Sequence, residues 1–167
     1  MKSRFRYWMP ALVVAILISL FSTHYFSSQQ TARVIIPALH RLFPFAAYRT
    51  LSRMHTAIRK MAHVVEFGVF SATVFHGVRG NRPGWRWDWA GYTLLIAVVF
   101  AGLDEWHQSF VPLREARFRD VLIDSTGALL AQVLVWVYAK IDHQSAGSGP
   151  SSDAPLSLPS SATRSRE

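Results

Sequence analysis

Residues 90–139 place a charged stretch between two apolar ones: "AGYTLLIAVVFAG" (90–102), "LDEWHQSFVPLREARFRDVLID" (103–124) and "STGALLAQVLVWVYA" (125–139). The apolar runs are continuous, and a helix satisfies its own backbone in hydrocarbon, whereas a strand must close into a barrel. A charged side chain at the centre of a membrane helix costs roughly 3 kcal/mol on insertion scales. These residues therefore predict two membrane helices, with a cluster of polar side chains at the end where they are connected.

Four segments of the chain have the length and composition of membrane helices. A hydrocarbon core of roughly 30 Å needs about 20 helical residues. We expect spans at approximately 7–26, 61–78, 89–106 and 121–138. Half of all residues are hydrophobic and only 17% are charged. The predicted fold is therefore all-α, an integral membrane bundle of about four transmembrane helices. The first segment follows a basic head without a clear cleavage site, which favours a retained signal anchor.

Two segments lie outside this pattern. Apolar residues recur at helical spacing from Leu51 to Met61, with Arg49, Arg53 and Lys60 on another face. This spacing predicts an interfacial amphipathic helix that leads into the second span, and a solvated basic loop is the alternative. Residues 143–167 are rich in Ser, Pro, Gly and Ala, so we expect a disordered tail after a membrane domain at 1–142.

The net charge of +8 is carried mainly by tails and loops that flank apolar segments. Anionic membrane lipids are a sufficient partner for such residues, and nucleic-acid binding is not expected. The chain has no cysteine, which excludes disulfides and thiolate metal sites. The first helix of a multi-pass protein usually determines its orientation in the membrane, and its basic head favours the cytoplasmic side. We therefore expect the protein in the cytoplasmic membrane, with the N-terminus and the C-terminal tail in the cytoplasm.

In an up-and-down bundle, the start of the second span, the end of the third and the start of the fourth lie on one side of the membrane. The polar residues near these three ends should therefore form one cluster on the outer face. Asp120 and Asp124 are four residues apart, and their face continues through small residues at Gly127, Ala128 and Ala131. Small residues let a neighbouring helix approach closely, so this face should point inward. The expected cluster contains Lys60, His63, Glu66, Asp104, Glu105, His107, Gln108, Arg114, Asp120 and Asp124.

Several roles are open to this cluster. If it binds a substrate, Arg114 suits an anion, and Asp104, Glu105 and His63 are the candidates for proton transfer. Lys60, Glu66, His107, Gln108, Asp120 and Asp124 would line the site. The alternative is a purely structural network of ion pairs that fixes helix register. A proton relay also remains open. The histidines and acids match no strong zinc signature, so no metal site is assigned, and the cofactor is unknown.

Three ordered motifs carry a family resemblance: "RKMAHVVEFGVF" (59–70), "DEWHQSFVPLR" (104–114) and "DVLIDSTGALLA" (120–131). Together they resemble the VanZ-like family of bacterial membrane proteins, over approximately residues 55–138. Two positions depart from the family pattern, because Leu113 and Ala131 stand where glycine is common.

The resemblance implies a multi-pass membrane protein of the cell envelope, in a family whose namesake is associated with low-level resistance to teicoplanin. It implies no established reaction, so whether the protein is an enzyme stays open. The leading hypothesis is that the cluster binds or modifies an envelope lipid or a cell-wall precursor. The alternative is a non-catalytic membrane scaffold whose polar cluster is structural. The oligomeric state is not predicted.

Overall fold

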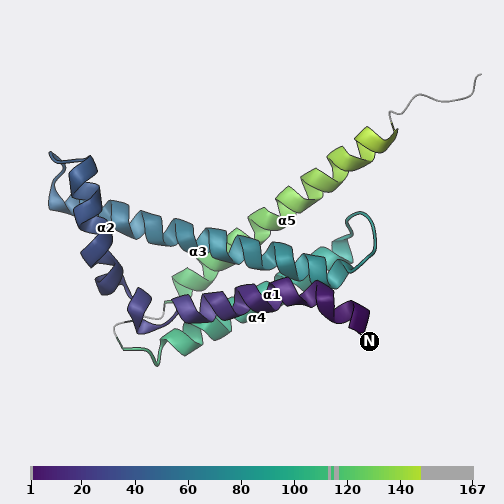
Figure 1. Ribbon diagram of the computed structural model, residues 1–167, viewed down its shortest axis with the longest axis horizontal. Helices are drawn as coiled ribbons and strands as arrows, with labels where there is room; N and C mark the ends of the chain where they lie inside the picture. Colours follow the sequence, from purple (N-terminus) through teal and green to yellow (C-terminus); the bar gives the residue numbers. More distant parts are fainter. Residues whose placement is uncertain (1, 113, 115–116, 148–167) are drawn as a thin grey trace, which may run out of the picture.

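A computed structural model describes residues 2–112, 114 and 117–147 of the chain. All regular structure in this part is helical, as predicted (Figure 1). The elements are α1 (Lys2–Phe21), the short 3-10 helix η1 (His24–Phe26), α2 (Ser28–Leu42), α3 (Tyr48–Arg79), α4 (Trp87–Gln108) and α5 (Phe118–Gly147).

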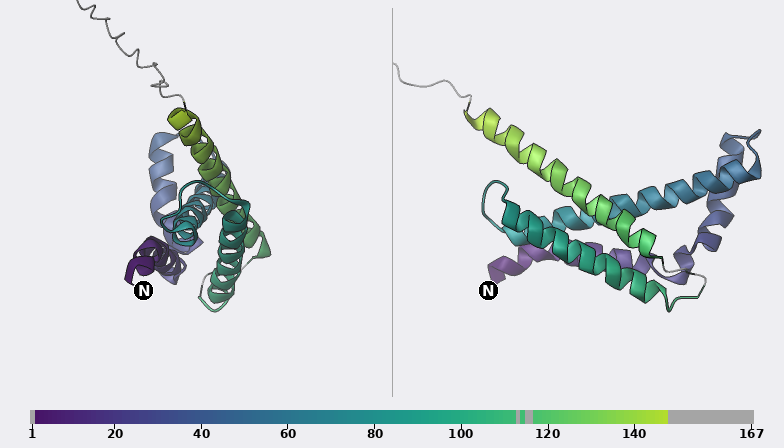
Figure 2. Two further views of the ribbon diagram at one scale, coloured as in Figure 1. Left: turned by 90° about the vertical axis from the view of Figure 1, so that its right-hand side faces the viewer. Right: turned by 180° about the vertical axis from the view of Figure 1, so that it is seen from behind.

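Helix α3 is the centre of the bundle, because it packs against α1, α2, α4 and α5. Helices α1 and α4 run in one direction and α3 and α5 in the other, and α5 crosses α3 diagonally (Figures 1 and 2). The end of α1, the end of α4 and the start of α5 consequently lie together, beside the first half of α3. The sequence-based prediction that these ends share one side of the bundle is confirmed.

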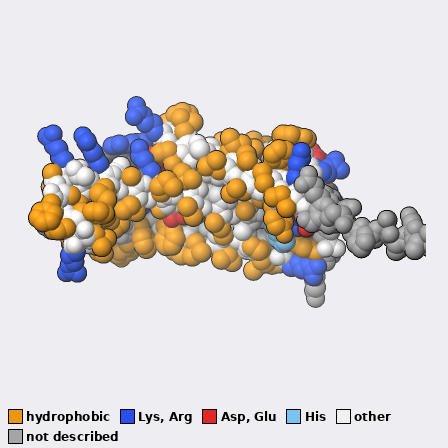
Figure 3. All heavy atoms as spheres, turned by 90° about the horizontal axis from the view of Figure 1, so that it is seen from above, with side chains coloured by type: hydrophobic (Ala, Val, Ile, Leu, Met, Phe, Trp, Pro, Cys, Tyr) orange, Lys and Arg blue, Asp and Glu red, His pale blue; other side chains and the backbone are white. Residues whose placement is uncertain are grey.

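The core between the helices is thin and rich in small residues. Phe67, Phe70 and Phe100 form an aromatic cluster, and Ala97 and Ala101 of α4 are completely buried beside it. Many large apolar side chains point outward instead, as on α1, α4 and α5. In the space-filling view, hydrophobic side chains cover much of the middle, and Lys and Arg gather toward the two ends (Figure 3). This distribution is that of a bundle surrounded by lipid.

Three helices of the described chain are long and apolar enough to cross a membrane, within α1, α3 and α5. The predicted third span forms a helix, α4, but does not meet the same criterion. Asp88 near its start and Asp104 and Glu105 near its end lower its hydropathy. Its 22 residues extend about 33 Å, and it packs against α3 and α5.

Helices α3 and α5 cross in close contact. A Cβ atom added to Gly127 would lie 2.9 Å from the Val64 Cα atom and closer still to the Val64 carbonyl oxygen. Only glycine permits this approach of the two backbones. The expectation that the small face of residues 127–131 packs against a neighbouring helix is therefore confirmed.

The observed helices add detail to two predictions of local structure. Residues 51–61 do not form a separate interfacial helix, because they belong to the continuous 32-residue helix α3. The amphipathic helix beside the bundle is α2, which lies steeply across the direction of α3 (Figure 1). Ser27 caps α2 by accepting a hydrogen bond from the Gln30 backbone N–H. Helix α5 continues to Gly147, beyond the predicted domain end at residue 142, and most of the predicted tail, residues 148–167, lies outside the described residues.

Candidate functional site

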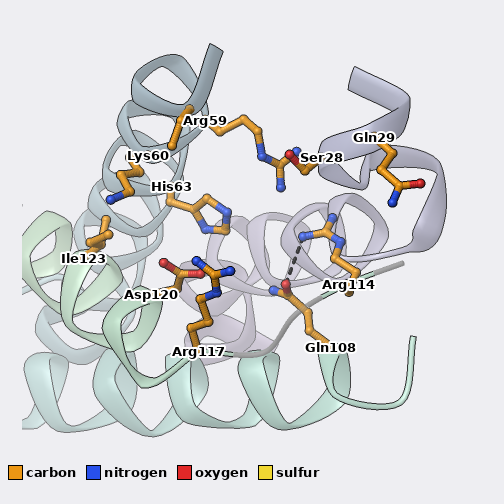
Figure 4. A pocket seen from close by; sticks show the side chains of 11 residues that line it. Ser28, Gln29, Arg59, Lys60, His63, Gln108, Arg114, Arg117, Asp120 and Ile123 are labelled. Atoms are coloured by element: carbon orange, nitrogen blue, oxygen red, sulfur yellow. Dashed lines mark hydrogen bonds between the residues drawn. The ribbon is translucent and has the colours of Figure 1, made fainter. Parts of the chain in front are cut away.

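A cavity of about 430 Å³ lies between α2, the first half of α3, the α4–α5 connection and the start of α5. Its charged lining is mostly cationic (Figure 4). The side chains around it are Ser28, Gln29, Thr56, Arg59, Lys60, His63, Gln108, Arg114, Arg117, Asp120 and Ile123.

Two arginines point toward this cavity from different elements. Arg59 comes from α3 and Arg114 from the connection after α4, and their guanidinium groups face each other across the space (Figure 4). Arg59 donates to the Phe26 carbonyl oxygen at 2.8 Å and to the Thr31 hydroxyl at 3.0 Å. Arg114 donates to the Gln108 side-chain oxygen at 2.9 Å and to the carbonyl oxygens of Phe21 and Thr23.

All of these acceptors are neutral. Neither guanidinium forms an ion pair with a carboxylate in the described part of the chain. Burial lowers the pKa of Arg114, and the positive charge of Arg59 lowers this pKa further, whereas Asp104 and Glu105 act in the opposite direction from a distance. Arginine ordinarily titrates far above neutral pH, so Arg114 remains charged there. The cavity thus holds two half-buried cations that have no carboxylate of the described residues in contact.

Asp104 belongs to a buried network that joins α1 to α4. It accepts hydrogen bonds from the Ser22 hydroxyl at 2.6 Å and from the Gln108 side-chain amide at 2.6 Å. Ser22, Asp104 and Gln108 are each at most 5% exposed. Gln108 then links this network to the cavity through its bond from Arg114. Asp104 therefore supports the cavity from behind and does not line it.

Glu105 also lies behind the cavity. It is 5% exposed and accepts a hydrogen bond from the Arg117 backbone N–H at 2.9 Å. This bond ties the end of α4 to the residue immediately before α5. Gln108 does not bridge Asp104 and Glu105, because its side-chain amide donates to Asp104 and Ser22.

His63 connects the cavity to a fully enclosed acid. Its Nδ1 atom lies 3.2 Å from Asp124 Oδ1, and Asp124 is 0% exposed. The two groups are within ion-pair distance, although the alignment is poor for a hydrogen bond. His63 also lines the cavity (Figure 4). A histidine held by a buried carboxylate beside a polar cavity can accept or donate a proton there.

A second, largely apolar pocket of about 230 Å³ adjoins the first. It lies between α1, η1, α2 and α3, and the two share the side chains of Arg59, His63 and Arg114. Its apolar lining is formed by Phe21, Phe26, Ile35, Ile58 and Ala62. Glu66 is on this side, so it borders the second pocket and not the first.

The structure brings most of the predicted site residues to one place, in two layers. Lys60, His63, Gln108, Arg114 and Asp120 line the cavity. Asp104, Glu105 and Asp124 lie buried behind it. His107 is not part of this group, since it is exposed and borders a shallow depression beside α1. Rotation of α4 about its axis places Gln108 inward and His107 outward, although they are adjacent in sequence.

Sequence reasoning missed several residues of the site. Arg59 precedes His63 by one helical turn, a spacing that places both on one face, but it was not singled out. The contributions of Ser22, Ser28 and Thr31 carry no sequence signal, because they depend on how α1 and α2 fold back against α3 and α4. Among the described residues, no group of three or more His, Asp or Glu side chains is arranged to hold a metal ion.

The model of the VanZ/LLP1 family matches residues 7–139. This range contains every predicted site residue and extends the expected range of 55–138 to include the first helix. No curated protein and no solved structure matches the chain.

Proposed function

This chain belongs to the VanZ/LLP1 family and is a membrane protein, and on that premise we propose that its cavity binds the anionic headgroup of an envelope lipid or cell-wall precursor. The pairing of Arg59 and Arg114 carries the proposal. Both are half buried, both point into the cavity, and their hydrogen-bond acceptors are neutral. Removing a cation from water is costly when no anion compensates it, and a bound phosphate or carboxylate would supply the missing charge.

The remaining residues have supporting roles in this proposal. Lys60 and Arg117 add positive charge to the cavity lining. His63, backed by Asp124, is the group that would exchange a proton with the bound headgroup if the protein also modifies it. Asp104 and Glu105 stabilise the elements around the cavity. Asp104 does so by bonding to Ser22 and Gln108, and Glu105 by bonding to the Arg117 backbone. We therefore place proton transfer at His63 rather than at Asp104 or Glu105.

The proposal includes a location and a cellular consequence. We propose that the protein lies in the cytoplasmic membrane with its N-terminus and C-terminal tail inside, so that the cavity opens at the outer face. An envelope precursor bound there would be less accessible to a glycopeptide, which connects the cavity to teicoplanin resistance.

A non-catalytic scaffold is the second candidate. The observation that favours it is the buried network of Ser22, Asp104 and Gln108, which joins two helices without a ligand. In that case the polar residues maintain the bundle, and substitution lowers abundance rather than binding.

The direct test measures thermal unfolding of the purified protein with and without inorganic pyrophosphate, at constant ionic strength. A ligand that binds only the folded state raises the unfolding temperature with concentration. The wild type and Arg119→Gln should both respond, because Arg119 is exposed and does not line the cavity. Arg59→Gln and Arg114→Gln should remain folded and lose the response. Equal responses in all four proteins would contradict the assignment of the anion site.

The cellular test measures teicoplanin susceptibility of a sensitive host that expresses the same four proteins, with membrane abundance quantified in the same cells. We expect wild type and Arg119→Gln to protect, and the equally abundant Arg59→Gln and Arg114→Gln not to protect. If the wild type does not protect, the resistance role is wrong for this protein, while anion binding is judged by the first test alone.

A further inference from the structure

Resting on the proposed anion site, we infer that the ligand is a phosphate-bearing amphiphile whose hydrocarbon chain lies in the apolar pocket between α1, α2 and α3. The shared chemistry of a headgroup and a free anion is the phosphate, so the anion site alone does not distinguish them. The adjoining apolar pocket does, because a water-soluble anion has no group to place there.

The two pockets are continuous at the cations. Arg59 and Arg114 line both the polar cavity and the apolar pocket, and His63 lies at the same border. A phosphate held between the two guanidinium groups is therefore at the boundary of the apolar lining. An amphiphile requires this arrangement, because its charged group would lie in the polar cavity and the first carbons of its hydrocarbon chain in the apolar pocket, with the two arginines between them.

The apolar pocket opens sideways, where lipid surrounds the bundle. Phe21, Phe26 and Ile58 are 39%, 44% and 42% exposed although they line it. A chain placed against these side chains would bury apolar surface that is otherwise incompletely covered, which favours binding. Helix α2, whose Ile35 closes one side, lies across the end of the bundle as an amphipathic helix does at the boundary of hydrocarbon and headgroups (Figures 1 and 2).

The size of the two pockets also fits a ligand of this kind. Their volumes of about 430 and 230 Å³ together fall within the roughly 300–1,000 Å³ of known small-molecule sites. The larger volume is on the cationic side, which leaves space for a phosphate with further polar groups attached.

The experiment compares equilibrium binding of two labelled probes to the full-length protein in phosphatidylcholine nanodiscs. Dihexanoyl phosphatidic acid carries two short chains, and glycerol 3-phosphate carries the same phosphate and glycerol without them. We expect the amphiphile to bind at least about tenfold more tightly, an advantage that fewer than two buried methylene groups would supply. Nanodiscs without protein give the partition of the amphiphile into lipid alone.

Variants of the protein then locate the hydrocarbon chain of the bound amphiphile. Ala62→Phe should fill the apolar pocket, because Ala62 lines that pocket and not the polar cavity. This variant should bind glycerol 3-phosphate as the wild type does and lose the tenfold preference for the amphiphile. Val65→Phe is the matched control, since Val65 is exposed on the same helix and lines neither pocket. Arg59→Gln should weaken the binding of both probes.

The outcomes separate this inference from the proposed function. Equal affinity for the two probes, or an undiminished preference in Ala62→Phe, would overturn the inference that the ligand is an amphiphile seated in the apolar pocket. The proposed anion site would not be affected. Binding of neither probe by the wild type, together with no response to pyrophosphate, would overturn the proposed function itself. A preference lost equally in Val65→Phe and Ala62→Phe would also overturn the assigned position of the chain.

Discussion

The Nδ1 atom of His63 on α3 lies 3.2 Å from a carboxylate oxygen of Asp124 on α5. The contact depends on the close crossing of the two helices. His63 is adjacent to Val64, whose backbone meets Gly127, and Gly127 is one helical turn from Asp124. The glycine that permits the crossing therefore also permits the pair that connects a fully enclosed acid to the cavity.

The two partners of this pair should not be equally sensitive to substitution. His63→Leu leaves a carboxylate with 0% exposure and no hydrogen-bond donor in the described chain, and breaking a buried pair in this way costs about 3–5 kcal/mol. Asp124→Asn leaves a histidine that faces the cavity and can remain neutral, so it should cost less. Thermal unfolding in detergent of the two single variants and the double variant measures both effects. A larger loss in Asp124→Asn than in His63→Leu would show that the pair does not stabilise the carboxylate.

Glycine should be required where α3 and α5 cross. Gly127→Ala places a Cβ atom against the Val64 backbone, and overpacking of this kind destabilises by about 1–3 kcal/mol. Gly102→Ala is the control, because its added Cβ would meet nothing within 4 Å and alanine is the better helix former by about 1 kcal/mol. We expect the unfolding temperature to fall in the first variant and to stay the same or rise in the second. Similar values in both would mean that α3 and α5 separate at little cost.

Asp104 should act through stability. Asp104→Ala removes the acceptor of both Ser22 and Gln108, and leaving buried donors unsatisfied costs about 1–3 kcal/mol each. We expect lower membrane abundance and a lower unfolding temperature, with unchanged pyrophosphate affinity per folded molecule. Asp88→Ala is the control on the same helix, since Asp88 is exposed and pairs only locally with Arg86. Normal stability of Asp104→Ala with loss of binding would instead support the direct role that the sequence suggested.

Thr31 should hold α2 against α3. Its hydroxyl accepts a hydrogen bond from Arg59 at 3.0 Å and lies 3.1 Å from His55 Nε2. Thr31→Val keeps the shape of the side chain and removes both contacts, so the amides of α2 should exchange with deuterium faster than in the wild type. Thr126→Val is the control, because the Thr126 hydroxyl bonds only to Leu122 of its own helix. Unchanged exchange in α2 would show that apolar contacts alone dock this helix.

The sequence was sufficient for the features that depend on local patterns. Continuous apolar runs predicted the helices, and the short polar stretches at their ends predicted a cluster on one side of the bundle. The three motifs were sufficient to suggest the family. Each of these follows from hydropathy and from spacing along one helix, which neighbouring elements do not alter.

The tertiary structure decided which polar residues reach the cavity. Successive residues on a helix point about 100° apart, so the rotation of α4 turns Gln108 toward the cavity and its neighbour His107 away from it. Ser22 meets Asp104 across 82 positions, and the fold of η1 and α2 brings Thr31 to Arg59. Local periodicity contains no information about such pairings, because helix rotation and crossing depend on the packing of all the helices together. The sequence by itself thus determined a helical membrane protein with a polar end, and only the packing determined that two arginines share a cavity there.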